Sequence, residues 1–262
     1  MKRIYVAATE QHAGKTTISV GLYKAATERG YRACFIKPVG QRYVMEDNEQ
    51  VDEDAVLFKR ALQAGGAIKA LSPVTIPRGF TSNYIFDRDP EAIHGRILAA
   101  VDSLEEGHDV MIIEGTGHAG VGSVVDSSNA QVAKLLDARC LIVTGGGIGR
   151  CIDELCLNEA LFDRLGVTVI GAIINKVYQE KYEKVSAAVR QGLANKGMKC
   201  LGVIPYRREL TYPTMLAIQE EFDLEVLCGG AHLGKKVRNI IVAAMAPQNM
   251  IHYLTDGSLV VV

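Results

Sequence analysis

Apolar runs of strand length alternate with segments of helical period along the first two hundred residues. The apolar runs predict buried strands at 4–8, 32–40, 109–114, 139–144, 167–174 and 200–204. The segments between them predict helices at 18–26, 55–62, 90–104, 130–136, 153–165 and 180–196. Strands separated by helices require a doubly wound, mostly parallel sheet, so the predicted fold class is α/β.

The pattern changes after residue 205, and we predict a domain boundary there, with domains at 1–205 and 206–262. The second part predicts helices at 215–221 and 247–254 and strands at 224–228, 237–243 and within 257–262, the last of them buried. So small a piece has a marginal core of its own. It either packs on the first domain, pairs with a second copy, or continues in a longer chain.

Three connecting segments carry further expectations. The acidic run at 46–54 is expected to be a solvated loop and helix N-terminus, with one carboxylate a candidate Mg²⁺ ligand. Residues 65–89, rich in glycine and proline, are expected to form an irregular, functional or flexible loop. The helix at 130–136 is expected to be capped by Asp126 or Ser127.

A Gly-Lys-Thr sequence lies between the first predicted strand and the first helix. Backbone N–H groups of such a loop point at phosphate oxygens, and the helix dipole adds positive potential. Lys15 is expected to reach the β- and γ-phosphates of a nucleotide, and the Thr16 hydroxyl to bind Mg²⁺. The first glycine of the usual pattern is replaced by Thr9. The predicted nucleotide-binding residues of this loop are Thr9, His12, Ala13, Gly14, Lys15, Thr16 and Thr17. A solvated loop histidine remains the alternative for His12.

Two further charged residues stand at the ends of predicted strands. Glu114 ends an apolar run and precedes Gly115, the pattern of a carboxylate that holds Mg²⁺ directly or through water. Lys37 ends the second strand, at the edge where parallel sheets place their ligand sites. A solvated lysine that ends a strand is the alternative for Lys37.

Composition limits the partners of the chain. The 262 residues carry a formal net charge of −1, so no attraction to nucleic acid or to an anionic membrane is expected. No apolar run approaches the ~18 residues of a membrane span, and the start lacks a signal-peptide pattern, which predicts a cytoplasmic protein. The six cysteines form no C-x-x-C pair and are expected to be buried, reduced thiols without a metal.

Five separated motifs resemble dethiobiotin synthetase and its relatives, which include the nucleotide-binding half of cobyrinic acid a,c-diamide synthase. They are residues 9–16, 37–39, 52–55, 114–115 and 174–177. Residues 203–262 resemble the opening half of the DRTGG domain, which follows a dethiobiotin-synthetase-like domain in some phosphotransacetylases. The DRTGG sequence itself is absent, so we expect a partial, truncated domain.

The resemblance implies a P-loop NTPase fold, an ATP and Mg²⁺ site and a homodimer. Lys15 and Lys37 would be catalytic, with Lys37 stabilising the charged carbamate and phosphoryl oxygens. Thr16, Asp54 and Glu114 would hold the metal, and Asn175 would hydrogen-bond the adenine. These roles are implied by the family and not by spacing alone.

Departures from the family pattern concern the acceptor. Gln11 and His12 replace a Thr-Glu pair, and Gln41 replaces a small hydroxyl residue. Two hypotheses follow. One is an ATP- and Mg²⁺-dependent enzyme that activates a carboxylate or carbamate of an unidentified small-molecule acceptor. The other is a nucleotide-sensing regulatory module joined to a DRTGG domain. Glutamine-dependent amidation is disfavoured, because the chain has no room for a glutaminase half.

Overall fold

The computed structural model describes residues 1–262, which divide into two compact units. The first unit comprises Met1–Tyr206 and the second Arg207–Val262. Each unit is described by itself.

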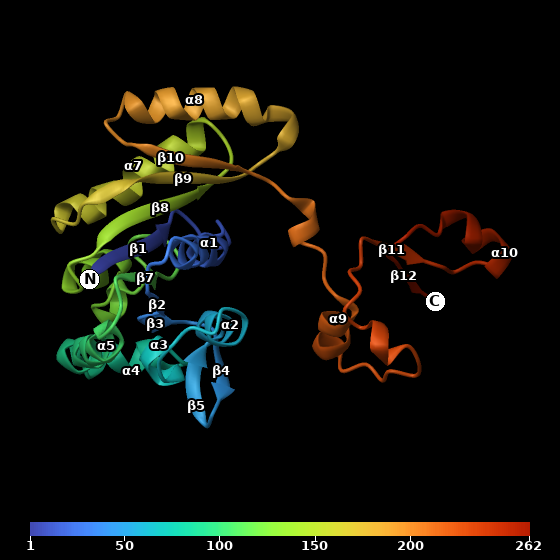
Figure 1. Ribbon diagram of the computed structural model, residues 1–262, viewed down its shortest axis with the longest axis horizontal. Coiled ribbons are helices and arrows are strands. Elements are labelled where there is room, and N and C mark those ends of the chain that lie inside the picture. The colour runs from blue at the N-terminus through green and yellow to red at the C-terminus, as the bar shows by residue number, and fades with distance from the viewer. The chain divides into compact units, whose positions relative to one another are not determined.

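A six-stranded sheet forms the centre of the first unit (Figure 1). Its strands are β1 (Lys2–Ala8), β2 (Ala33–Ile36), β7 (Val110–Glu114), β8 (Arg139–Gly145), β9 (Val169–Val177) and β10 (Cys200–Pro205). They lie in the order β10-β9-β8-β1-β7-β2, and every neighbouring pair is parallel. The predicted doubly wound α/β fold is confirmed.

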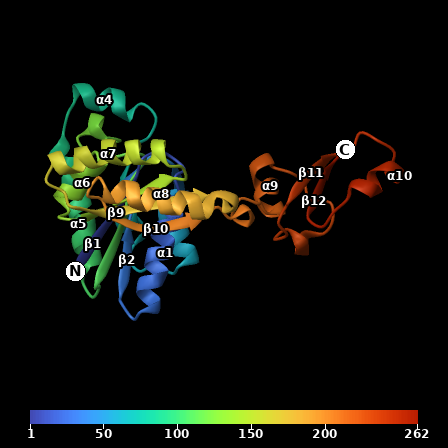
Figure 2. The ribbon, with the colours of Figure 1, turned by 90° about the horizontal axis from the view of Figure 1, so that it is seen from above.

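Helices follow the strands and pack against the sheet. The main ones are α1 (Lys15–Glu28), α2 (Glu53–Ala61), α5 (Pro90–Glu105), α6 (Asn129–Leu135), α7 (Gly149–Arg164) and α8 (Tyr182–Ala194). Helix α1 packs on β1, β2 and β7, whereas α7 and α8 pack on β8, β9 and β10 (Figures 1 and 2). Helices also cover the edge strand β2 and its neighbour β7, so both strands are buried at every residue, and their sequences are apolar up to Glu114 at the end of β7.

Aromatic side chains join helices to the edge of the sheet. The Phe58 ring of α2 stacks on Phe35 of β2 with centroids 3.5 Å apart, and it meets Tyr23 of α1 edge-on at 5.6 Å. Such pairs contribute about 0.5–1.5 kcal/mol beyond the burial of their area. They fix α2, and the acidic residues at its start, beside the end of β2.

The acidic run at 46–54 differs from the predicted loop. It contributes to an antiparallel hairpin of β4 (Tyr43–Glu46) and β5 (Glu49–Asp52), from which α2 continues. Asp47 and Asn48 turn the hairpin with φ of 50° and 62°. Short Asx side chains tolerate this left-handed conformation, so the two residues allow a tight turn between strands.

The segment 65–89 is also more regular than predicted. It contains α3 (Ile68–Leu71), β6 (Val74–Thr75) and α4 (Phe80–Phe86), and β6 pairs in parallel with β3 (Val39–Gly40). The cap of α6 is Ser128, not Asp126 or Ser127, because Ser128 and Gln131 form a reciprocal capping box.

The second unit contains α9 (Met215–Phe222), β11 (Asn239–Val242), α10 (Pro247–Met250) and β12 (Ser258–Val261). Its two strands pair in parallel. The strand predicted at 224–228 is wrong: no strand pairs with this segment, and Leu227 is 86% exposed. The predicted helix at 247–254 continues as a 3-10 turn after Met250, and β12 is half-buried rather than buried.

Two sequence expectations on composition are tested by the structure. None of the helices has both the length and the apolar character that crossing a membrane requires. All six cysteines are free, and Cys34, Cys140 and Cys151 are buried. Contrary to the prediction, Cys156 and Cys200 are half-buried, and Cys228 is exposed because it lies in the segment that does not form a strand.

Candidate functional site

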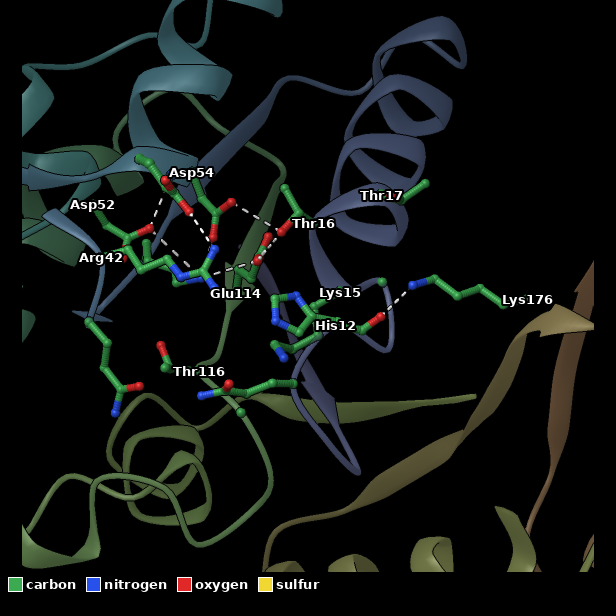
Figure 3. Close-up of a pocket in the computed structure, with 16 residues that line it drawn as sticks. His12, Lys15, Thr16, Thr17, Arg42, Asp52, Asp54, Glu114, Thr116 and Lys176 are labelled. Carbon is green, nitrogen blue, oxygen red and sulfur yellow. Dashed lines mark hydrogen bonds and ion pairs between the residues drawn. The ribbon is translucent and has the colours of Figure 1, made fainter. Parts of the chain in front are cut away.

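Four strands of the sheet deliver the candidate residues to one edge. The phosphate-binding loop follows β1, Lys37 follows β2, Glu114 ends β7, and Asn175 lies at the end of β9. The carboxyl ends of parallel strands meet at the same edge, where α/β proteins bind ligands. A cavity of about 300 Å³ opens there (Figure 3). Its lining includes the predicted residues His12, Gly14, Lys15, Thr16, Thr17, Lys37, Asp54 and Glu114.

The loop before α1 is held from the end of β9. Gly14 has a φ of 102°, and a Cβ at this position would lie 2.2 Å from Nδ2 of Asn175. That amide nitrogen donates a hydrogen bond to the Ala13 carbonyl at 2.9 Å. The Lys176 ammonium donates to the His12 carbonyl at 2.6 Å. Glycine is required here for both conformation and space, and the backbone of the loop is fixed before any ligand binds.

Lys37 lies at the centre of a carboxylate cluster. Its side chain is buried, and its Nζ lies 2.5 Å from Oδ2 of Asp54, 3.1 Å from Oε1 of Glu114 and 3.9 Å from Oδ1 of Asp52. Removing one partner from such a buried network leaves an uncompensated charge, which typically costs about 3–5 kcal/mol. The cluster therefore places a fixed ammonium group on the wall of the cavity.

The Thr16 hydroxyl connects α1 to the same carboxylates. It donates to Oε1 of Glu114 at 2.8 Å and lies 3.1 Å from Oδ1 of Asp54 (Figure 3). Oε2 of Glu114 is buried and has no hydrogen-bond partner. No three His, Cys, Asp or Glu side chains are arranged to hold a metal by themselves. Two carboxylates and a hydroxyl nevertheless form the hard oxygen set that suits Mg²⁺, which keeps water and phosphate ligands as well.

Burial and mutual charge displace the pKa values of the cluster. Burial alone would lower the pKa of Lys37, but Glu114, Asp54 and Asp52 raise it above the ordinary lysine value. Burial and repulsion from Lys37 lower the pKa of Lys15. Burial raises the pKa of Glu114 against the opposing effect of Lys37. Lys37 thus stays charged at neutral pH because three carboxylates face it.

Some predicted residues support the loop and do not line the cavity. Thr9 is buried, and its hydroxyl pairs with that of Thr144 at 3.0 Å. Ala13 is buried with its carbonyl turned to Asn175. Asn175 itself is 6% exposed, and its amide nitrogen is used within the protein. The structure gives these three residues partners in the protein, and their predicted nucleotide contacts stay predictions.

The cavity also contains residues that the motifs did not single out as binding residues. They include Arg42, Asp52, Glu53, Thr116, Gly117 and Lys176. Asp52 caps α2 by accepting from the Asp54 N–H, a signal readable in the Asp52-Glu53-Asp54 sequence. Arg42 and Thr116 carry no comparable signal, since they reach the cavity through the hairpin and the loop after β7.

Asn129, buried at the start of α6, fixes that loop. Its Oδ1 accepts hydrogen bonds from the Tyr5 hydroxyl and the Thr116 N–H, each at 2.9 Å. Its Nδ2 donates to the carbonyls of Thr116 and His118. The Thr116 hydroxyl donates to the Val39 carbonyl at 2.6 Å. The wall of the cavity opposite the Lys37 cluster is thereby rigid as well.

Comparison with known families agrees with this geometry. Residues 2–214 match the model of the AAA_26 family, described as an AAA domain. The chain belongs to the AAA_26 family. Residues 217–262 of this AAA_26 chain match the DRTGG domain. The resemblance deduced from the motifs is thereby confirmed for both parts of the chain.

Two curated relatives of this AAA_26 chain illustrate its range. The phosphate acetyltransferase of Pseudomonas putida is 26% identical over 100% of the chain but only 38% of its own length. The ATP-dependent dethiobiotin synthetase of Methanococcus vannielii is 26% identical over 70% of the chain and 86% of its own length. The chain thus spans less than two fifths of that acetyltransferase and most of the synthetase.

Solved structures show the same fold. A plasmid partition protein of Borrelia burgdorferi, bound to AMPPNP, superposes with a TM-score of 0.52 at 15% identity, over 80% of this chain and 89% of its own. At this identity the likeness concerns the fold alone. Family and fold together support an ATP-binding P-loop protein.

Proposed function

We propose that the chain binds Mg²⁺-ATP and transfers the γ-phosphoryl group to a carboxylate or carbamate, as a member of the dethiobiotin synthetase class. The observation that carries the proposal is the pair of buried ammonium groups, Lys15 and Lys37, on the wall of one cavity beside Thr16, Asp54 and Glu114. Two buried positive charges suit a ligand whose reacting oxygens are all anionic.

The loop and the two lysines would each bind a different part of the ligand. Backbone N–H groups at the start of α1, together with the helix dipole, would bind the β- and γ-phosphates, and Lys15 would neutralise their charge. Lys37 would face the acceptor and the equatorial oxygens of the transferring phosphoryl group. Its carboxylate partners hold it in place, so it need not reorganise as charge moves during the transfer.

Thr16, Asp54 and Glu114 would hold the metal. The Glu114 carboxylate oxygen that has no partner is the observation in favour of a cation at this position. Mg²⁺ bound there would neutralise charge on the phosphate oxygens during transfer. A homodimer, as in the family, is part of this proposal.

A second candidate is a nucleotide-sensing module with little or no ligase activity. It is favoured by the side chains at Gln11, His12 and Gln41, all of which line the cavity where the family has other residues. The nucleotide half of the site would then be used for binding alone.

The decisive experiment measures phosphate release from Mg²⁺-ATP with and without 7,8-diaminononanoate and bicarbonate. Strong stimulation by the diamine identifies a dethiobiotin synthetase. Slow turnover that ignores the diamine favours the sensing module or another acceptor. Failure to bind Mg²⁺-ATP, measured by calorimetry, would exclude both candidates.

A further inference from the structure

A second, smaller cavity adjoins the one that holds the lysines. It measures about 50 Å³ and shares Gln41 and Thr116 with the larger cavity. Its lining combines apolar and polar side chains: Val39, Ile76, Val121, Val124 and Val125 on the one hand, and Gln41, Thr81, Thr116, Ser127 and Asn129 on the other. At about 10–15 Å³ for each water-sized group, it accommodates roughly three to five non-hydrogen atoms. Figure 3 shows Thr116 across the larger cavity from Asp54 and Thr16.

One hydroxyl group in this small cavity lacks a partner. Ser127 is 2% exposed, lines the cavity, and its Oγ forms no hydrogen bond within the protein. The Thr116 hydroxyl, by contrast, is bonded to the Val39 carbonyl. Burying a hydroxyl without a partner typically costs about 1–3 kcal/mol, so the group is expected to serve a ligand that enters the cavity.

The loop that carries Ser127 is fixed in place. The Ser127 N–H donates to the Gly122 carbonyl at 3.0 Å. The neighbouring Asp126 binds the Arg88 guanidinium through both carboxylate oxygens, at 2.6 and 2.7 Å. The Tyr84 hydroxyl donates to the same carboxylate at 2.9 Å. Ser127 is therefore held in a defined position on the wall of the small cavity.

We propose that the small cavity receives the carbon chain of the acceptor, and that the acceptor is a carboxylate of two or three carbons with a hydroxyl group on its chain. This inference rests on the proposed function. The carboxylate would lie beside Gln41 and Thr116, the residues that line both cavities, facing the lysines. The chain would enter between the valines, and its hydroxyl would pair with Ser127.

The volume of the small cavity and the absence of charge from its lining restrict the class of acceptor further. The lining of the small cavity contains no charged side chain, so a second carboxylate or an ammonium group inside it would be buried without a partner. A longer chain exceeds the volume. Short hydroxy acids such as glycolate and lactate fit these limits, whereas dicarboxylates and long diamines do not.

The reaction with such an acceptor is balanced without a further reagent. An ionised carboxylate oxygen forms a bond to the γ-phosphorus, and the bond from that phosphorus to the β–γ bridging oxygen breaks. ADP leaves with the electron pair, and the product is an acyl phosphate. Because the carboxylate is already ionised, no proton has to be removed, and the small cavity has no side chain that would act as a base.

The test compares ligands with and without the hydroxyl group. Binding of glycolate and acetate, and of lactate and propionate, is measured by calorimetry on the full chain in the presence of Mg²⁺-AMPPNP. We expect the hydroxy acid to bind about tenfold more tightly in each pair, because a site built for a hydroxyl rejects the analogue without it. In Ser127→Ala this ratio should fall to about one, while AMPPNP affinity stays unchanged.

Matched controls separate this role from folding. Ser186→Ala, on α8 and outside both cavities, should keep the tenfold preference. Ser127→Ala should melt at the same temperature as the parent protein or slightly higher, since it removes a buried hydroxyl without a partner. Hydroxylamine trapping of an acyl phosphate from ATP and glycolate tests the reaction itself.

The possible outcomes are distinct. If AMPPNP binds but hydroxy and plain acids bind equally, or Ser127→Ala leaves the preference intact, this inference is overturned and the proposed function stands. If glycolate binds selectively and no acyl phosphate is trapped, the site is confirmed in a sensing module and the transfer step is wrong. If AMPPNP does not bind, the proposed function and this inference both fail.

Discussion

The charges of the site interact too closely for any one of them to act alone. Lys37 faces three carboxylates, and repulsion from Lys37 together with burial lowers the pKa of Lys15. Lys15 therefore holds its proton less firmly than an ordinary lysine, and an anionic ligand beside it would restore that hold. Binding of a polyphosphate thus relieves a destabilising feature of the empty cavity wall.

This reasoning predicts that Lys15→Ala loses nucleotide binding and keeps the fold. The variant removes a charge-assisted contact to phosphate, and we expect ATP affinity to fall by about 100-fold or more. Calorimetry measures the affinity and thermal melting the fold. Lys24→Ala, on the exposed side of the same helix, should bind like the parent protein. Unchanged affinity in Lys15→Ala would remove the phosphate-binding role of the loop.

A second prediction concerns the metal. Asp54→Asn and Glu114→Gln keep the shape of the side chain and remove a ligand charge, so each should weaken ATP binding about tenfold with Mg²⁺ present. In excess EDTA the loss of affinity should be clearly smaller, because the contribution that passes through the metal is then absent from the parent protein as well. Asp102→Asn, an exposed residue of α5, serves as control. Equal losses with and without Mg²⁺ would show that neither residue holds it.

The sequence is sufficient to predict which residues form the centre of the site, but not which residues surround them. Local context is enough to identify a Gly-Lys-Thr sequence between a strand and a helix as a phosphate-binding loop. The same holds for an acidic residue at the end of an apolar strand. Lys37 was ambiguous, and only the structure shows it buried among carboxylates. Arg42, Thr116 and Ser127 depend on how a hairpin and a loop fold back, which no local pattern records.

Two glycines, one just before helix α1 and one within it, differ in whether a side chain could replace the hydrogen. Gly14 has a left-handed conformation and touches Asn175, whereas Gly21 lies in the helix with open space where a Cβ would stand. Gly14→Ala should therefore destabilise the protein by about 1–3 kcal/mol and abolish ATP binding. Gly21→Ala should stabilise it by about 0.5–1 kcal/mol. Urea unfolding measures both, and effects of the same sign would contradict the geometry.

Regular elements were predictable where burial imposes a period, and less so elsewhere. The six main strands follow from apolar runs because each is covered by helices. The hairpin at Tyr43–Glu46 and Glu49–Asp52 is not predicted, because its strands are short, β4 is largely exposed, and the signal lies in the two left-handed turn residues, Asp47 and Asn48. The segment 224–228 does not form the strand that its apolar content predicts, because apolar content alone does not supply a pairing partner.

The two units differ in how much apolar surface they bury. The first has an extensive buried core around its six strands. In the second, β11 and β12 form a two-stranded sheet on which Ile240 and Val242 are 64% and 70% exposed. A sheet of two strands is marginal in water on its own. All residues that line the candidate cavities belong to the first unit.

Residues 1–206 alone should therefore fold and bind ATP. We expect a cooperative melting transition and an affinity within about twofold of the full chain, since every predicted phosphate and metal contact is retained. Residues 207–262 alone should show no cooperative transition, because too little apolar surface is buried to offset the entropy of ordering the chain. Calorimetry and circular dichroism on the two polypeptides provide the measurement. A tenfold loss of ATP affinity in residues 1–206 would contradict this prediction. It would mean that nucleotide binding depends on the second unit.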